Sequence, residues 1–195
     1  AGTNGRFYTI LGANFPGGRG MGEPVRLIVD LPNDADVVDL MIHRPGERLI
    51  VASSDGDGFI VPADEVVAQT RAGKQVMNLV DGAVMAACVP VAGDHVAVAS
   101  KNRKLLVFPL AELPEMTRGK GVRLQKYNMT RGRQGVLELD GGLSDLTTFT
   151  LAEGLSWPMP NGNTRTETGI AEWVAKRAGV GRAPPHGFPR ANRFC

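Results

Sequence analysis

The chain has 195 residues, 43% apolar and 22% charged, with a formal net charge of +2. This composition is that of a globular protein with a sizeable core, and no apolar run approaches the roughly 18–20 residues that span a bilayer. The N-terminal residues lack the apolar core of a signal peptide. Only two cysteines, Cys88 and Cys195, are present, which excludes a disulfide scaffold and predicts a reducing, cytoplasmic setting.

Short segments rich in Val, Ile and Leu predict a succession of β-strands along the chain. These segments are 25–31, 47–53, 58–62, 94–100, 104–108 and 122–127. SSDGDG (53–58) and SKNRK (100–104) lie between paired segments and fit hairpin turns. After the second strand of each pair, residues 63–68 and 110–115 each predict a single helical turn.

The C-terminal part has a different pattern. Residues 134–141 and 146–151 predict final strands. Ile170, Trp173 and Val174 form an apolar stripe with helical spacing, so a helix is expected over 166–179, ending at Gly179. The remaining residues, rich in Pro, Gly and Arg, are expected to be extended.

An internal repeat indicates the architecture. Residues 46–71 align with 93–118 at an offset of 47 without a gap, and eight pairs are identical. A weaker copy, 7–22, overlays 106–121 at an offset of 99. Four short strands per repeat of this length predict an all-β, propeller-like array of blades of about 47–52 residues. The expected division is an array over 1–157 and a helix-containing tail over 158–195.

Charge is distributed unevenly along the chain. Residues 1–100 carry 7 basic and 12 acidic side chains, 101–133 carry 9 and 2, and 134–195 carry 6 of each. A basic segment of this kind suggests a surface that faces a polyanion, although a solvated face would have the same composition.

The basic residues are concentrated in glycine-containing turns, TRAGKQ (70–75) and TRGKGV (117–122), where glycine permits a tight bend and leaves N–H groups open to an anion. The spacing fits neither a P-loop nor a dinucleotide fingerprint. No calcium loop, zinc-ligand spacing or nucleophile motif is found, so no metal site and no catalytic residue are predicted. The candidate contacts to a phosphate backbone, with solvated turn cations as the alternative, are Arg19, Arg71, Lys74, Lys101, Arg103, Lys104, Arg118, Lys120, Arg123, Lys126, Arg131 and Arg133.

The strands ASSDGDGFIVP and ASKNRKLLVFP, the turns TRAGK and RGKG, and the tail segments GGLSDLTTFTLAEGLSW and GFPRANRF resemble the C-terminal domains of the A subunits of DNA topoisomerase IV (ParC) and gyrase. The resemblance implies a β-pinwheel, a propeller-like disc whose blades exchange strands and whose rim binds and bends DNA. The gyrase version carries a glycine-arginine box close to QRRGGKG. Here GGRGMGE, TRAGKQ and TRGKGV are degenerate, which favours topoisomerase IV.

The resemblance also implies the functional setting. Double-stranded DNA, the ParE ATPase subunit, and the remainder of the ParC subunit would be the partners, and the location would be cytoplasmic and nucleoid-associated. No cofactor is expected in this part of the protein, because ATP and Mg²⁺ would be used by other domains of an ATP-dependent type II topoisomerase. About three blades are visible, so an upstream part of the disc is expected to be missing. The rival hypothesis is a propeller-like protein-interaction platform without a DNA role.

Overall fold

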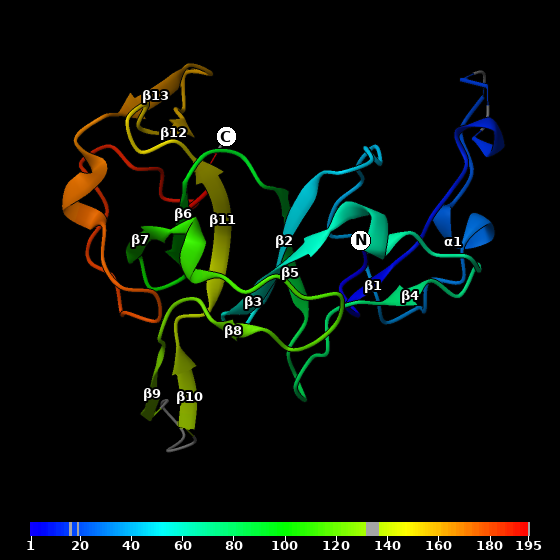
Figure 1. The fold of residues 1–195 in the computed structure, drawn as a ribbon, viewed down its shortest axis with the longest axis horizontal. Helices are drawn as coiled ribbons and strands as arrows, with labels where there is room; N and C mark the ends of the chain where they lie inside the picture. Colours follow the sequence, from blue (N-terminus) through cyan, green and yellow to red (C-terminus); the bar gives the residue numbers. More distant parts are fainter. Residues whose placement is uncertain (16, 19, 132–136, 195) are drawn as a thin grey trace.

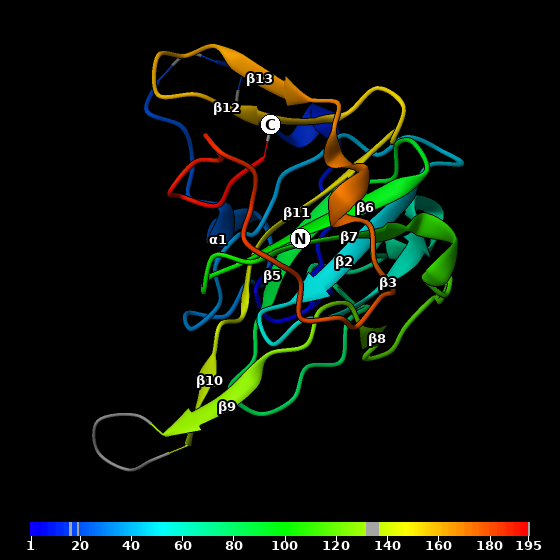
Figure 2. The same ribbon diagram turned by 90° about the vertical axis from the view of Figure 1, so that its left-hand side faces the viewer.

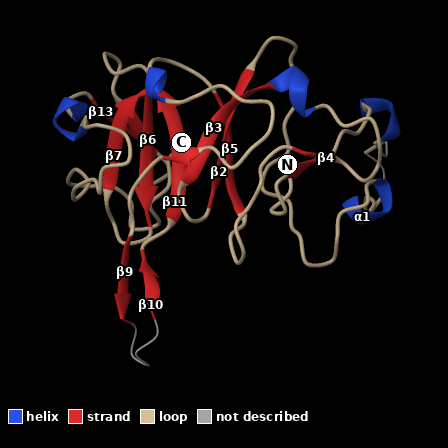
Figure 3. Ribbon diagram, turned by 60° about the horizontal axis from the view of Figure 1, so that its bottom comes forward, coloured by secondary structure: helices blue, strands red, loops and turns tan. Residues whose placement is uncertain are grey.

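The computed structural model describes residues 1–15, 17–18, 20–131 and 137–194. Its secondary structure consists mainly of short strands (Figure 3), with one four-residue α-helix and four short 3-10 helices among the described residues. The prediction of an all-β chain is therefore confirmed, as are the paired strands and the single helical turn that follows each pair.

The first complete unit shows how the chain is organised. Strands β2 (Arg48–Ser53) and β3 (Asp57–Pro62) form a hairpin, followed by the 3-10 turn η2 (Ala63–Val66). The chain then leaves its own hairpin, and β4 (Lys74–Gln75) pairs with β1 (Arg6–Phe7). It returns as β5 (Met85–Pro90), which pairs with β2.

The second unit repeats this path. Strands β6 (His95–Ser100) and β7 (Leu105–Pro109) form the hairpin, followed by η3 (Leu110–Glu112). Strand β8 (Val122–Arg123) crosses to β3 of the first unit, and β11 (Leu143–Phe149) returns to β6. The resulting sheets have the orders β5-β2-β3-β8 and β11-β6-β7 and stand side by side (Figure 1). Strand exchange between neighbouring blades follows from this path.

Both faces of each hairpin are buried, which explains why these strands are apolar throughout rather than alternating. Ile50 and Ala52 face the second sheet and pack with Val96 and Val98. The alternate residues of each strand face the opposite way. In β2, Val51 packs in a cluster with Phe7 and Met77. In β6, Ala97 and Ala99 pack in a cluster with residues of the C-terminal part. Each sheet is therefore a layer between two others.

The C-terminal residues form a third, shortened unit. Strands β12 (Leu155–Pro158) and β13 (Thr164–Glu167) make a hairpin, the 3-10 turn η4 (Ile170–Trp173) follows, and the chain then runs along β7 through bridges Val107–Val174 and Leu105–Arg182. The equivalent contacts of the second unit on β3 are the bridge Ile60–Glu115 and the pair Gly58–Val122. The tail therefore repeats the hairpin, turn and crossing of the blades, and the boundary expected at 157/158 falls inside its hairpin.

A further hairpin is inserted into the second unit between β8 and β11. Strands β9 (Asn128–Arg131) and β10 (Leu137–Asp140) pair with each other and project away from the sheets (Figures 1 and 2). Among the described residues, β9 and β10 pair only with each other.

Three sequence predictions of secondary structure are wrong or too long. Residues 25–31 do not form a strand: α1 (Val25–Ile28) begins after Pro24, and no neighbouring strand among the described residues pairs with it. The helix expected over 166–179 is replaced by β13 and the 3-10 turn η4. The strand expected over 122–127 ends at Arg123, because only two residues pair with β3. In the weak N-terminal repeat, Phe7 is the only described residue in a strand, and the other described residues are loop with the 3-10 turn η1 (Gly12–Asn14).

Candidate nucleic-acid interface

Three crossing segments share one backbone geometry. Gly73, Gly121 and Gly181 have φ values of +73°, +84° and +77°. A Cβ at these positions would lie only 2.7, 2.4 and 2.7 Å from the carbonyl oxygens of Phe7, Gly58 and Leu105, at equivalent points of β1, β3 and β7. Only glycine tolerates both that backbone conformation and so close an approach. The turns around these glycines (70–75, 117–123 and 176–182) are called turns 1, 2 and 3 below.

Turns 2 and 3 are each hydrogen-bonded to the segment that follows the previous turn. The Asn78 N–H donates to Gly119 O at 2.8 Å, and the Gly119 N–H donates to Val76 O at 3.0 Å. One unit further, the Lys126 N–H donates to Gly179 O at 3.0 Å, and the Ala178 N–H donates to Leu124 O at 2.9 Å. The three turns therefore form a row, which runs from β4 past β8 to the tail across the lower half of Figure 1.

Turns 1 and 2 were recognisable in the sequence from the repeat, whereas turn 3 was not predicted. Its signal was present as KRAGVGR (176–182), but the spacing between the equivalent glycines lengthens from 48 residues to 60, so the constant offset of the earlier repeats no longer matched. The expected helix over 166–179 also covered part of this segment.

The cations of turn 1 are paired with acids. Arg71 lies 3.6 Å from the Asp30 carboxylate and donates to Leu27 O at 2.7 Å. Lys74 lies 3.4 Å from Glu65. These are exposed pairs that contribute little to stability, but the neighbouring carboxylates offset the positive field that a phosphate would meet at this turn.

Turn 2 divides its cations between two roles. Lys120 and Arg123 each lie 3.1 Å from the Asp57 carboxylate, whose side chain is only 5% exposed. A buried carboxylate requires such partners, because an unpaired buried charge is costly. Arg118 is exposed instead, and its one side-chain hydrogen bond to a described residue is to the neutral Asn78 Oδ1, at 3.3 Å. Arg118 is therefore freer than Lys120 or Arg123 to meet an external anion.

The remaining candidates lie at several places. Arg103 donates to Pro189 O at 3.1 Å and to Asn192 Oδ1 at 3.3 Å, so it holds the tail against the β6–β7 turn. Lys101, Lys104 and Lys126 form no ion pair with any described acidic residue. Arg131 lies in β9 and pairs through its backbone with Leu137, while Arg19 and Arg133 lie outside the described residues.

Tyr127 does not provide an exposed stacking surface. Its ring is buried, burial raises the pKa of its hydroxyl far above the usual range, and that hydroxyl donates to Gln125 Oε1 at 3.5 Å. A base-stacking contact through this ring is therefore not supported, and any recognition by the row would rest on cations and backbone N–H groups.

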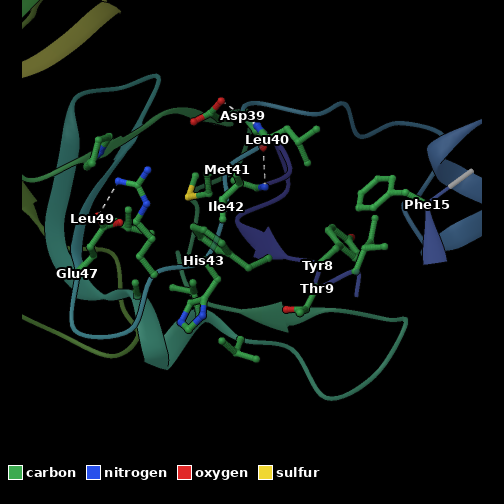
Figure 4. A pocket seen from close by; sticks show the side chains of 18 residues that line it. Tyr8, Thr9, Phe15, Asp39, Leu40, Met41, Ile42, His43, Glu47 and Leu49 are labelled. Carbon is green, nitrogen blue, oxygen red and sulfur yellow. Dashed lines mark hydrogen bonds and ion pairs between the residues drawn. The ribbon is translucent and has the colours of Figure 1, made fainter. Parts of the chain in front are cut away.

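A cavity of about 570 Å³ lies elsewhere, between the first strand and residues 39–47 (Figure 4). Its lining is mainly apolar, and its polar members already have partners: His43 Nε2 lies 2.9 Å from Asp64, and Arg44 lies 3.4 Å from Glu47. Over the described residues, no cluster of His, Cys, Asp and Glu could hold a metal ion, and no helix is long enough to cross a membrane.

Comparison with known proteins agrees with this architecture. The family model described as "DNA gyrase C-terminal domain, beta-propeller" matches residues 47–92 and 94–141, from the hairpin of the first unit to the end of the inserted hairpin. The A subunit of DNA topoisomerase 4 from Rickettsia conorii is 42% identical over 192 residues, which cover 98% of this chain and 24% of the relative. The same protein of Caulobacter vibrioides is 40% identical with the same coverage, and that of Escherichia coli K12 is 30% identical over 70% of this chain and 19% of the relative. The chain thus spans about a quarter of the length of the first two relatives.

Solved structures show the same arrangement. The E. coli ParC C-terminal domain superposes with a TM-score of 0.77 at 25% identity, over 97% of this chain and 76% of that chain. A DNA gyrase A C-terminal domain shares the fold with a TM-score of 0.62 at 17% identity, over 80% of this chain and 52% of that chain.

The exchanged strands and stacked units define a propeller-type domain of the β-pinwheel class, with sheets that do not close into a ring among the described residues. Within that class, the chain belongs to the family of C-terminal domains of topoisomerase IV and gyrase A subunits.

Proposed function

We propose that the chain binds duplex DNA along the row of turns and holds or bends it for strand passage by a type IIA topoisomerase. The observation that carries the proposal is the docking of turns 2 and 3, each onto the segment that follows the previous turn, which aligns successive cationic turns. Cations placed in this way contact phosphates without reading sequence. The domain has no catalytic role in this proposal.

The wider setting of the proposal is that of a topoisomerase IV A subunit. The other domains of that polypeptide would cleave DNA with Mg²⁺, and a ParE ATPase subunit would use ATP. The domain would position duplexes for decatenation and supercoil relaxation on the nucleoid. The curated relatives of this name support this setting.

Titration of the chain against a random-sequence duplex at a series of salt concentrations tests the proposal. We expect binding that weakens steeply with salt, since each neutralised phosphate contributes about 0.9 to the slope of log K against log salt. We also expect Arg118→Glu to weaken it. Arg44→Glu is the matched control, because Arg44 is exposed and lies outside the three turns. Absent or salt-insensitive binding would refute the proposal and favour a protein-interaction platform.

A further inference from the structure

Turn 3, on the tail, repeats the geometry of the two turns that precede it. Its glycine, its close approach to the neighbouring hairpin and its two backbone hydrogen bonds all have counterparts in turn 2. The segment that carries it follows a hairpin and a 3-10 turn, as in the two blades. Turn 3 is therefore placed by the fold as the next member of the row.

The ion pairs along the row leave progressively more positive charge unpaired toward the tail. Both cations of turn 1 face an acid, and in turn 2 Lys120 faces one whereas Arg118 faces none among the described residues. At turn 3, Lys176 and Arg182 are exposed, and neither pairs with an acid among the residues that the structure describes. From residue 173 to 195 the sequence contains five basic residues and no Asp or Glu.

Arg177, which lies between these two cations in the sequence, has a different role. The Arg177 guanidinium donates to Glu112 O at 3.1 Å and to Arg123 O at 2.6 Å, and the Arg177 N–H donates to the Glu112 carboxylate at 2.9 Å. These bonds fix turn 3 to the second unit, next to turn 2. The exposed cations on either side of Arg177 are therefore held on a rigid support rather than on a free tail, which lowers the entropy cost of contacting an anion.

We propose that turn 3 is a DNA-backbone site in its own right, with Lys176 and Arg182 as its phosphate contacts, and that the duplex follows the row from turn 2 onto the tail rather than toward turn 1. This inference rests on the proposed function and adds a direction to the path. It assigns the tail a share in binding, beyond its structural role of covering β7.

The test is salt-dependent titration of the full chain with a random duplex, for Lys176→Glu, Arg182→Glu and the double variant. We expect each single change to lower the salt slope by about 0.9 and the double change by about 1.8. Arg71→Glu at turn 1 is the comparison variant and should have the smaller effect. Because neither Lys176 nor Arg182 forms an ion pair with a described residue, urea unfolding of these variants should match the parent chain.

The outcomes separate the two proposals. If Arg118→Glu weakens binding while the double variant at turn 3 binds with the parent slope, this inference is wrong and the proposed function stands. If Arg71→Glu reduces the slope more than the turn 3 double variant does, the direction of the path is wrong. If the parent chain does not bind duplex at all, the proposed function itself fails.

Discussion

The Arg123 guanidinium lies 3.1 Å from the Asp57 carboxylate, across the junction between β8 and β3. Arg123 also donates to the Asp55 carbonyl. This contact joins the second unit to the first at the point where a strand crosses between them. A residue first considered for its charge is therefore part of the connection between blades.

Replacing Arg123 with Met should destabilise the chain by about 2–3 kcal/mol. This is below the roughly 3–5 kcal/mol of a fully buried pair, because Lys120 remains beside Asp57 and Arg123 is 38% exposed. Urea unfolding measures the change. Arg118→Met is the control and should stay within about 0.5 kcal/mol. The double variant Arg123→Met/Asp57→Asn should lose less stability than the sum of the two single variants. A loss equal to that sum would show that the two side chains do not interact.

Substitutions of Lys120 and Lys126 should affect different properties, stability in the first case and DNA binding in the second. Lys126 is exposed and has no acidic partner among the described residues, whereas Lys120 faces Asp57. We expect Lys126→Glu to lower the salt slope of duplex binding by about 0.9 with unchanged unfolding. Lys120→Met should lower the free energy of unfolding. Equal effects of both changes on unfolding would contradict this division.

Gly121→Ala should be far more costly than Gly82→Ala. Both glycines have positive φ, +84° and +77°, so both substitutions carry the left-handed penalty of about 1–2 kcal/mol. Only at Gly121 would the new Cβ lie 2.4 Å from Gly58 O, whereas nothing lies within 4 Å at Gly82. We expect Gly121→Ala to cost about 3 kcal/mol or more, measured by urea unfolding. Similar costs for both would show that the junction between β8 and β3 can relax.

Asp145 should make stability pH-dependent in the acid range. Burial raises the pKa of its carboxyl, against the hydrogen bonds donated by the Phe194 and Leu146 N–H groups. At a pH between the unfolded pKa and the raised native pKa, Asp145 therefore keeps a proton in the folded chain that it has released in the unfolded chain. This group's contribution to stability falls as pH rises from about 4, the unfolded value, through the raised native pKa.

Comparison with Asp145→Asn isolates this contribution. The variant should gain stability relative to the parent chain across that interval and keep a constant difference above it, as measured by urea unfolding between pH 3 and 7. The exposed Asp81→Asn is the control. A difference that stays flat, or that moves in the opposite direction, would contradict the assignment.

Much of the fold could be predicted because the hairpin β2–β3 and the hairpin β6–β7 align in sequence at a constant offset of 47 residues. Their apolar character reflects burial on both faces, and the repeat of 47 residues shows that they occupy equivalent places. Residues 25–31 have a similar composition, but no strand among the described residues pairs with them, so their β-propensity was not decisive. In the tail, Ile170 and Trp173 have helical spacing, but the contacts of 174–182 with β7 limit the helix to one 3-10 turn.

The sequence predicted which segments of the candidate site are basic, but not which acidic residue each basic side chain contacts. The sequence indicates which segments are basic, whereas the partner of each cation depends on which hairpin the crossing segment reaches. Asp57 is 63 residues from Lys120, and Asp30 is 41 residues from Arg71. Only the strand exchange brings these side chains together, so the difference between a free cation and a neutralised one is a property of the tertiary structure.

The crossing of the tail over β7 has a consequence for association. The Leu105 N–H donates to Arg182 O at 2.8 Å, the Arg182 N–H donates back at 3.0 Å, and the Ala175 N–H donates to Val107 O. A strand with an open hydrogen-bonding edge can recruit a strand from another molecule. Because the tail satisfies this edge from within the same chain, it protects the last full blade from edge-to-edge aggregation.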